Sequence, residues 1–489
     1  MPEERADLLN MHNPKTFHRI ARFNLRLFLA CGLSVFTLLI GPFNAFAEDI
    51  VPSKELSLTE CIELSLTSSP DVLAAQERIE QARAAVQQAQ SGFYPRFSVG
   101  ETFVRSDFAP LVFSNQLAQG ELSGDFPAMP PPGFDPFAQF NDPGPLSNWS
   151  TQFLLQWPVF QGGKTFYGNR AAIASLSAAE LELQAVHNNL AYAVSNAYYQ
   201  ILKTESSIRI AEQSAAQIQS HLDIARARYE GEIALKSDVL RVTVRLAEAQ
   251  EALAIARHNL DRAKSRLNLA LGLPVNQPLA LTNDRPLLLP PTDADQTLAE
   301  LTELARLQRP EIERMNNSIA SLENAVNAAR AGHYPQLNAF AHYDIDSEDF
   351  SDSNESWTVG LSANISIFDG FLTRSAVSSA RARLREAEAQ KEQTILQVEM
   401  DVKNAFLGRS EAATRLQVLQ QAVAEAEESV RILSERYAEG MALTTELLDA
   451  EVALTNARLH ELSAKYDYLI ASAALERAVG AIIDEGSGQ

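Results

Sequence analysis

Three carboxylates hold matching or neighbouring places in two turn regions of the chain. Asp238 and Glu446 are separated by 208 positions (446 − 238), and Asp449 follows Glu446 by three. Side chains three apart on a helix share one face, so Glu446 and Asp449 are expected on the same side. Rings of such acids attract cations or close an aperture with a polar network. The alternative is that each carboxylate only solvates the start of a helix, where negative charge is favourable.

Catalytic and metal-binding patterns fail when their spacing is checked. Gly162-Gly-Lys-Thr165 resembles the end of a phosphate-binding loop, but the first glycine of that motif falls on Pro158. The acidic loop Asp344–Glu355 lacks the glycine and the spacing of a calcium loop. The histidines form no metal-binding motif, and three stand in helical patterns that favour packing or solvation: His187, His221 and His258. We therefore expect no enzyme activity, no cofactor and no metal.

The two turn regions belong to a duplicated unit. Its paired motifs are Gly92-Phe-Tyr-Pro95 with Gly332-His-Tyr-Pro335, Phe160-Gln-Gly162 with Phe368-Asp-Gly370, Arg228-Tyr229 with Arg436-Tyr437, and Leu271-Gly272 with Val479-Gly480. All but the first pair recur after 208 positions (436 − 228). The first pair recurs after 240 (332 − 92), so the first copy has 32 extra residues (240 − 208) after its Tyr-Pro. We assign residues 48–287 to the first repeat and 288–489 to the second.

Each repeat predicts the same series of elements. A short helix begins near Leu58 or Leu298, breaks at Pro70 or Pro310, and resumes to about residue 90 or 330. Two strands follow, at about 96–104 and 150–160 in the first repeat and 336–344 and 357–368 in the second. The last has clean alternation, with Trp357, Val359 and Leu361 on one face. A polar loop, 346–356, and a longer proline-rich loop in the first repeat connect the strands.

Very long helices follow the strands. The patterns run over about 164–229 and 372–437, and shorter helices return over about 236–271 and 445–479. About 66 residues at ~1.5 Å each span roughly 100 Å, which exceeds any globular core. These segments predict extended helical hairpins of coiled-coil type, with turns near Gly231 and Gly440.

The N-terminus and the charge restrict where the protein works. Residues 1–47 have a basic flank, an apolar run and the small-x-small site Ala45-Phe-Ala47, which predicts a signal peptide, with Met1 or Met11 as the start. The formal net charge of −21 argues against a nucleic-acid partner. Cleavage of the signal peptide would remove Cys31 and leave Cys61 as the only cysteine, so no intrachain disulfide is expected.

The strands have the length that a bilayer requires. No stretch after residue 47 approaches 18 apolar residues, so a membrane crossing would use strands. Four strands cannot close a barrel, and an open edge in lipid is very costly. A dimer would give eight strands, whose interior is filled by side chains, whereas a trimer would give twelve and a conduit. The alternative is a half-buried sheet in a soluble domain.

The order of these features resembles the TolC-like family of outer-membrane efflux proteins. The resemblance covers nearly the whole chain after the leader and implies a mainly α protein with a membrane β-barrel. It implies a homotrimer in outer-membrane lipid, with a 12-stranded β-barrel and a 12-helix periplasmic α-barrel. Such a duct passively conducts substrates that an inner-membrane pump delivers through a periplasmic adaptor. Two alternatives remain: the exit duct of a type I protein secretion system, and a non-channel periplasmic coiled-coil spacer.

The resemblance also implies roles at the hairpin turns. Acids at these positions narrow the periplasmic tip in the family, which assigns a gate to Glu446 and Asp449, with Asp238 as partner and Tyr229 and Tyr437 as braces. Tip and adaptor-docking roles fall to six residues: Gly231, Leu235, Lys236, Ser237, Gly440 and Leu443. Two departures stand out. Gly231 precedes the residue that matches Gly440, which is Glu232, and Ala442 replaces a basic residue that forms a gate link in the family.

Overall fold

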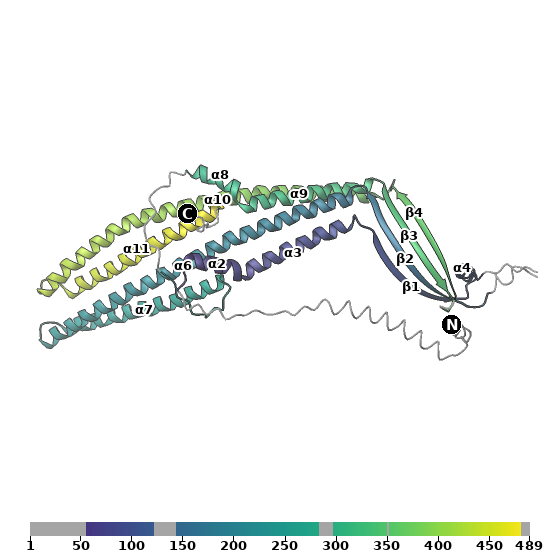
Figure 1. Ribbon diagram of the computed structural model, residues 1–489. Coiled ribbons are helices and arrows are strands. Elements are labelled where there is room, and N and C mark those ends of the chain that lie inside the picture. The colour runs from purple at the N-terminus through teal and green to yellow at the C-terminus, as the bar shows by residue number, and fades with distance from the viewer. Residues whose placement is uncertain (1–54, 122–142, 283–296, 350–351, 481–489) are drawn as a thin grey trace, which may run out of the picture. The chain divides into compact units, whose positions relative to one another are not determined.

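The computed structural model describes residues 55–121, 143–282, 297–349 and 352–480. The predicted signal peptide, 1–47, lies outside the described residues, as do 122–142 of the proline-rich loop. Two structural themes fill the described part: a four-stranded sheet at one end, and helical hairpins that run away from it (Figure 1).

The sheet is antiparallel, with its strands in chain order. It contains β1 (Arg96–Ser106), β2 (Leu146–Gln161), β3 (Gln336–Ser347) and β4 (Ser353–Asn364). β2 pairs with β3 across the junction of the repeats, so both repeats share one sheet. Because paired residues lie on the same face, odd-numbered positions of β1, β3 and β4 and of most of β2 share one face. This face is largely apolar, and the even-numbered face is largely polar.

The strands occur in the predicted order, but their ends differ: β2 begins at Leu146 rather than at 150, and both ends of β4 shift by four residues. β4 ends at Asn364 rather than at residue 368, because its partner β3 begins only at Gln336, after Pro335. At its other end β4 starts at Ser353 rather than at 357, since polar residues of the predicted loop continue the pairing with β3. The connection is thus 348–352 rather than 346–356. The predicted alternation holds within β4, where Trp357, Val359 and Leu361 share a face.

A helix within the first long loop is absent from the sequence prediction. α4 spans Ala109–Gln119, with Pro110 in its first turn and a left-handed Gly120 (φ 74°) after its last residue. Proline at the start and glycine at the end are ordinary helix boundaries. The proline-rich composition that follows led to the incorrect prediction of an irregular loop.

The long helices agree closely with the prediction. α6 (Lys164–Glu230) packs on the returning α7 (Lys236–Ala270), and α10 (Leu372–Ala438) packs on α11 (Thr444–Val479). α6 also contacts α11, which joins the hairpins of the two repeats (Figure 1). Among the described residues, no helix combines the length and the apolar character needed to cross a membrane.

Short helices pack along the parts of α6 and α10 that the shorter returning helices, α7 and α11, do not reach. α2 (Leu58–Ser68) and α3 (Pro70–Ser91) lie along α6, and α8 (Leu298–Gln308) and α9 (Pro310–Arg330) contact α10. A single 3₁₀ turn, Ala331–His333, follows α9. Both α2 and α8 begin with a capping box, Ser57 with Glu60 and Thr297 with Glu300.

Two glycines allow the helix ends to meet. Gly272 (φ 72°) ends the α7 segment against the α2–α3 break, and a Cβ there would lie 2.6 Å from the carbonyl oxygen of Ser68. Gly480 (φ 93°) ends the α11 segment against the α8–α9 break, where a Cβ would lie 2.9 Å from the carbonyl carbon of Gln308. The left-handed backbone and the close contact both require glycine.

The apolar core is a series of clusters along the helices. The largest cluster joins α2 to α6 and α7 and contains Cys61, Ile201 and Leu267, each fully buried. Burial raises the pKa of the Cys61 thiol to about 12, because the thiolate would lose its hydration. A smaller cluster near the turns joins Leu222 and Val242 to Leu448 of the second repeat.

Candidate functional site

The two hairpin turns have the same backbone geometry. After α6, Glu232 N donates to Tyr229 O (3.0 Å) and Ile233 N to Arg228 O (2.8 Å). After α10, Gly440 N donates to Tyr437 O (3.1 Å) and Met441 N to Arg436 O (2.8 Å). Both are Schellman motifs, which end a helix with a left-handed residue. Every matched position again differs by 208 (440 − 232).

The left-handed position is a glycine in only one turn. Gly440 has φ 78°, and its counterpart Glu232 has φ 59°. Gly231, the predicted turn glycine, has an ordinary negative φ of −79°. Glu232 thus carries a steric cost of about 1 kcal/mol that glycine would avoid.

Two of the predicted gate carboxylates bind the start of their own helices. The Leu443 N–H donates to Glu446 Oε2 (3.1 Å), and the Leu235 N–H donates to Asp238 Oδ2 (3.3 Å). Each acid satisfies a backbone donor that the helix leaves unpaired, and its charge suits the helix dipole. Helix capping, the alternative that the sequence left open, is therefore one role of both residues.

The third carboxylate, that of Asp449, forms an ion pair with a residue of the other repeat. Asp449 Oδ1 on α11 lies 3.6 Å from Arg245 Nη2 on α7, and Arg245 also pairs with Glu248 at 2.8 Å. The side chain of Asp449 is 73% exposed, so the pair is screened by water and salt. This ion pair joins the two hairpins near the turns, although Ala442 stands where a basic residue forms a gate link in the family.

A second contact between the repeats joins Arg228 at the end of α6 to Tyr437 at the end of α10. Arg228 Nη2 donates to Tyr437 O (2.9 Å), and the guanidinium lies 4.3 Å from the centroid of the Tyr437 ring. Tyr437 is 7% exposed, whereas its counterpart Tyr229 is 44% exposed. The structure thus distinguishes the two tyrosines that the sequence paired, and it adds Arg228, which the sequence analysis did not select.

The surface of the turns is apolar and accessible. Leu235 is 70% exposed and Leu443 is 66% exposed, and Ile233 (81%) and Met441 (59%) extend the same surface. The remaining predicted tip residues are exposed beside them: Gly231, Lys236, Ser237 and Gly440. Large exposed apolar side chains in one place are typical of a binding surface.

A buried polar cluster lies farther along the helices. Glu451 on α11 is 5% exposed, and its Oε1 accepts from Gln217 Nε2 (2.9 Å) and lies 3.4 Å from His221 Nε2 on α6. Next to it, Thr455 and Ser214 share a hydrogen bond of 3.2 Å. Sequence analysis could not identify this cluster, because Glu451 and Gln217 are 234 residues apart.

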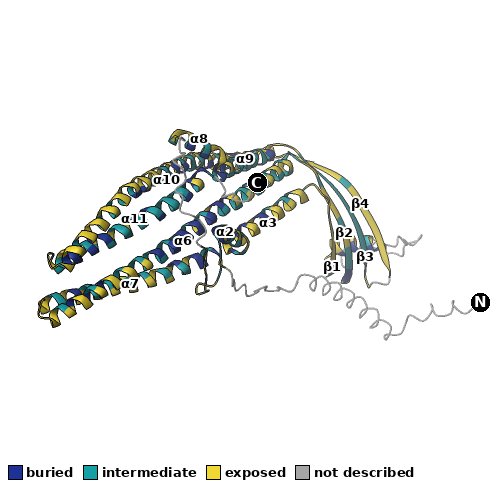
Figure 2. Ribbon diagram, turned by 60° about the vertical axis from the view of Figure 1, so that its left-hand side comes forward, coloured by how far each residue is buried: buried dark blue, intermediate teal, exposed yellow. Residues whose placement is uncertain are grey.

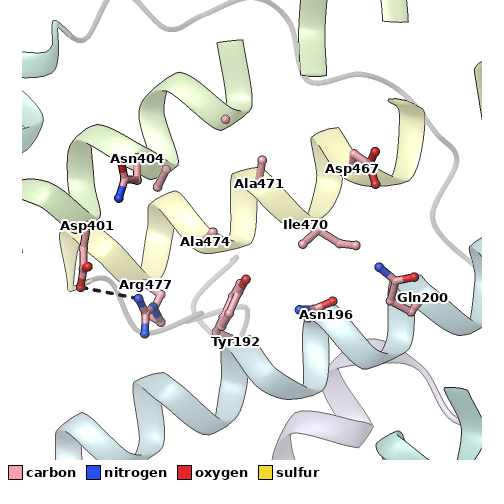
Figure 3. Close-up of a pocket in the computed structure, with 12 residues that line it drawn as sticks. Tyr192, Asn196, Gln200, Asp401, Asn404, Asp467, Ile470, Ala471, Ala474 and Arg477 are labelled. Atoms are coloured by element: carbon pink, nitrogen blue, oxygen red, sulfur yellow. Dashed lines mark ion pairs between the residues drawn. The ribbon is translucent and has the colours of Figure 1, made fainter. Parts of the chain in front are cut away.

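A groove of about 430 Å³ lies between α6, α10 and α11, away from the turns (Figure 3). Arg477 Nη2 lies 3.7 Å from Asp401 Oδ2, and its guanidinium lies 5.3 Å from the Tyr192 ring centroid. At the other end of the groove Asp467 accepts from Lys203 at 3.0 Å. The contacts of Arg477 with Tyr192 and of Asp467 with Lys203 join the two repeats along the helices, whereas the Arg477–Asp401 pair joins α10 to α11 within the second repeat.

The apolar face of the sheet is most exposed on the two outer strands, β1 and β4, which are exposed along most of their length (Figure 2). Trp357 is 74% exposed, Val359 70% and Leu361 81%, and Phe97 (66%) and Val99 (53%) continue the surface on β1. Each strand has at least the 11 residues of β1, which is enough for a tilted strand to cross the hydrocarbon core. Such a face fits lipid rather than water.

A family model for the outer membrane efflux protein matches residues 61–273 and 301–481. The chain belongs to this family. The match covers both repeats and stops at the joints marked by Gly272 and Gly480. It confirms the family predicted from the sequence, an outer-membrane location and a function in efflux.

Known relatives agree over most of the chain. It is 25% identical over 354 residues to the alkaline protease secretion protein AprF of Pseudomonas aeruginosa, covering 71% of this chain and 72% of AprF. It is 24% identical over 425 residues to the pyoverdine export outer membrane protein OpmQ of Pseudomonas putida, covering 86% of this chain and 85% of OpmQ.

A solved structure shows the same fold. The Campylobacter jejuni CmeC outer membrane channel matches with a TM-score of 0.73 and 16% identity, over 88% of this chain and 87% of CmeC. The mostly helical architecture of this efflux protein is therefore shared with a known channel.

Proposed function

We propose that three copies of this efflux protein close their sheets into a 12-stranded β-barrel in the outer membrane. The observation that carries this proposal is the sheet itself. β1 and β4 each pair on one side only within the described residues, and the apolar face is exposed. Unpaired backbone groups in lipid cost several kcal/mol each, so the edges need neighbouring strands. Three sheets of four strands supply twelve, enough to enclose a lumen.

The helices of the three copies then continue the lumen into the periplasm. α6, α7, α10 and α11 contribute four helices a copy and twelve in a trimer. α6 and α10 have 67 residues each, which at ~1.5 Å a residue gives roughly 100 Å. The duct is passive: an inner-membrane pump, linked by a periplasmic adaptor, delivers the substrate.

The oligomer is tested by native mass spectrometry of the detergent-purified protein. The expected result is a mass of three chains that persists at low concentration and dissociates on heating. A folded monomer or dimer would contradict the proposal, because neither leaves an open lumen bounded by paired strands.

The hairpin turns form the gate in this proposal. In three copies, Asp449, Glu446 and Asp238 form acidic rings at the tip, and Tyr437 and Tyr229 stand behind them. Opening separates the α10–α11 hairpin from the α6–α7 hairpin near the turns, which breaks the contacts of Arg228 with Tyr437 and of Arg245 with Asp449. The gate therefore depends on cross-repeat contacts within each chain as well as on the rings.

The adaptor binds the apolar surface of the turns in this proposal. Leu235 and Leu443 are the anchors, with Lys236, Ser237, Gly231 and Gly440 around them. Leu235→Asp should reduce cross-linking to the adaptor in cells, whereas Ile255→Asp, at a position of α7 that is also exposed (54%) but lies away from the turn, should not. Unchanged cross-linking with Leu235→Asp would remove this surface from the proposal.

The likeness to AprF, a protein named for protease secretion, supports a second candidate: the exit duct of a type I protein secretion system. Deleting the chromosomal gene separates the two candidates. An efflux duct predicts greater sensitivity to small toxic solutes with an unchanged set of secreted proteins. Loss of a secreted protein, with solute sensitivity unchanged, would favour the secretion duct.

A further inference from the structure

The helix α4 is fixed across the end of the sheet that lies away from the long helices (Figure 1). Gln119 Nε2 donates to the carbonyl oxygen of Ser147 and to Asn148 Oδ1, both at 2.8 Å. Asn148 Nδ2 in turn donates to Asp346 Oδ1 (2.8 Å). The side chains of Gln119, Asn148 and Asp346 are all less than 9% exposed. Buried hydrogen bonds of this kind fix a single position for the helix.

A second contact reaches the last strand. Asn354 Nδ2 on β4 donates to the carbonyl oxygen of Ala118 (2.9 Å), and Gly120 packs beside Asn354. α4 therefore contacts β2, β3 and β4, although it follows β1 in the chain. It lies over the sheet rather than extending away from it.

The residues that hold α4 identify the face that it covers. Asn148, Asp346 and Asn354 are even-numbered residues of β2, β3 and β4, and the strand register places them all on the polar face. The apolar residues that would contact lipid lie on the opposite face. α4 is thus on the lumen side of the barrel in the proposed trimer.

Below α4 the same face remains polar. Asp344 accepts from Gln152 Nε2 (2.8 Å), and its Oδ2 lies 3.4 Å from His342 Nδ1. A helix with its side chains is about 10 Å across, so three copies of α4 occupy much of the mouth of a 12-stranded barrel.

We propose that α4 is a second, outward-facing constriction of the conduit, which sets the largest solute that can pass the outer mouth. The inference rests on the proposed trimeric duct. It assigns a size-limiting role to α4, the helix that the structure describes between β1 and β2. The turns regulate entry at one end, and α4 limits size at the other.

The test measures which polyethylene glycols enter the outer mouth of the full-length protein in planar bilayers. The polymers are added on the sheet side, and the polymer mass that halves the single-channel current is recorded. Gln119→Ala removes the bonds to β2 and should raise this mass by about twofold, as expected for a wider pore mouth. Ser114→Ala, an exposed position on α4, is the matched control and should match the wild type.

A reversible disulfide between α4 and β4 makes the test specific to the position of α4. A Cβ at Gly120 would lie 3.6 Å from the Cβ of Asn354, within the range for a disulfide. In the Gln119→Ala background, Gly120→Cys with Asn354→Cys should restore the wild-type size limit when oxidised and lose it when reduced. Equal size limits in all variants, with normal currents, would overturn the constriction but leave the duct intact. No current from the folded wild-type trimer would overturn the duct and the constriction together.

Discussion

The guanidinium of Arg228, at the end of α6, lies 4.3 Å from the ring centroid of Tyr437, at the end of α10. The two residues belong to different repeats, and the same arginine donates to the Tyr437 carbonyl oxygen at 2.9 Å. This hydrogen bond is shorter than the other contact between the two hairpins near the turns, the 3.6 Å Arg245–Asp449 ion pair. The two hairpins cannot separate at the tip unless it breaks.

Loss of the Arg228 side chain should favour the open tip. A cation–π contact contributes about 0.5–2 kcal/mol. Since 1.4 kcal/mol is about a tenfold change in an equilibrium, Arg228→Ala should raise the open fraction several-fold in single-channel records. Arg226→Ala, an exposed arginine on the same helix, is the control. An unchanged open fraction in Arg228→Ala would show that this pair does not restrain the gate.

Neutralising Asp449 should reduce cation selectivity. Its side chain is 73% exposed, so its charge acts on ions in solution more than on Arg245. Asp449→Asn should lower the preference for potassium over chloride in reversal potentials. Glu427→Gln, which removes a similar exposed partner of Arg458 on the helices, should not change it. Equal selectivity in both variants would place the selective charges elsewhere.

Replacing Glu232 by glycine should stabilise the hairpin between α6 and α7. Its φ of 59° is left-handed, as is the 78° of Gly440 in the matching turn. Glu232→Gly should stabilise the hairpin by about 1 kcal/mol, and Gly440→Ala should destabilise the other hairpin by a similar amount. Thermal unfolding of the purified variants at one scan rate measures both shifts. A lower melting temperature for Glu232→Gly would mean that its side chain stabilises the turn by more than the strain costs.

The helix joints should not tolerate a side chain. At Gly272 and Gly480 a Cβ would meet Ser68 O at 2.6 Å and Gln308 C at 2.9 Å. Alanine at either position should cost well over 1 kcal/mol and reduce the yield of trimer. Gly408→Ala is the control, since nothing lies within 4 Å of a Cβ there, and it should stabilise α10 by up to about 1 kcal/mol. A normal trimer yield from Gly272→Ala would show that the joint can move apart.

Cys61 should give a pH-dependent contribution to stability. Burial raises its pKa from 9.0 to about 12, so the folded state keeps the proton that the unfolded state releases. This contribution is complete below pH 9 and is lost as the pH rises toward 12. Cys61→Ala should flatten the fall in stability over this range, although the cavity lowers stability at every pH. An identical pH slope in the variant would contradict the assignment.

The fold could be predicted largely because its boundaries are local. Glycine and proline set the ends of the long helices to within a residue or two, and strand faces follow from a period of two. The end of β4 was misplaced because it depends on where the partner strand β3 begins, at Gln336 directly after Pro335. α4 was missed because the composition of the whole loop outweighed its own end signals, Pro110 and Gly120.

The contacts at the turns could not be predicted in the same way. Which side of α6 faces α11 depends on the rotation of helices that are more than 200 residues apart in sequence. The repeat offset equated Tyr229 with Tyr437, yet only Tyr437 is buried. Similarly, Glu446 and Asp238 match by position, and the sequence left open whether they line a gate or serve the start of a helix; their distances to Leu443 N and Leu235 N show that both cap a helix.

The most direct test of the account is the current carried by the purified protein in a planar bilayer. Three chains with one lumen predict discrete, long-lived, cation-selective current steps, which are rare in the wild type and have a higher open fraction in Arg228→Ala. The same preparation must first give the mass of a trimer, so that the material tested is the proposed assembly. A folded trimer that gives no current above the protein-free bilayer would contradict the conduit.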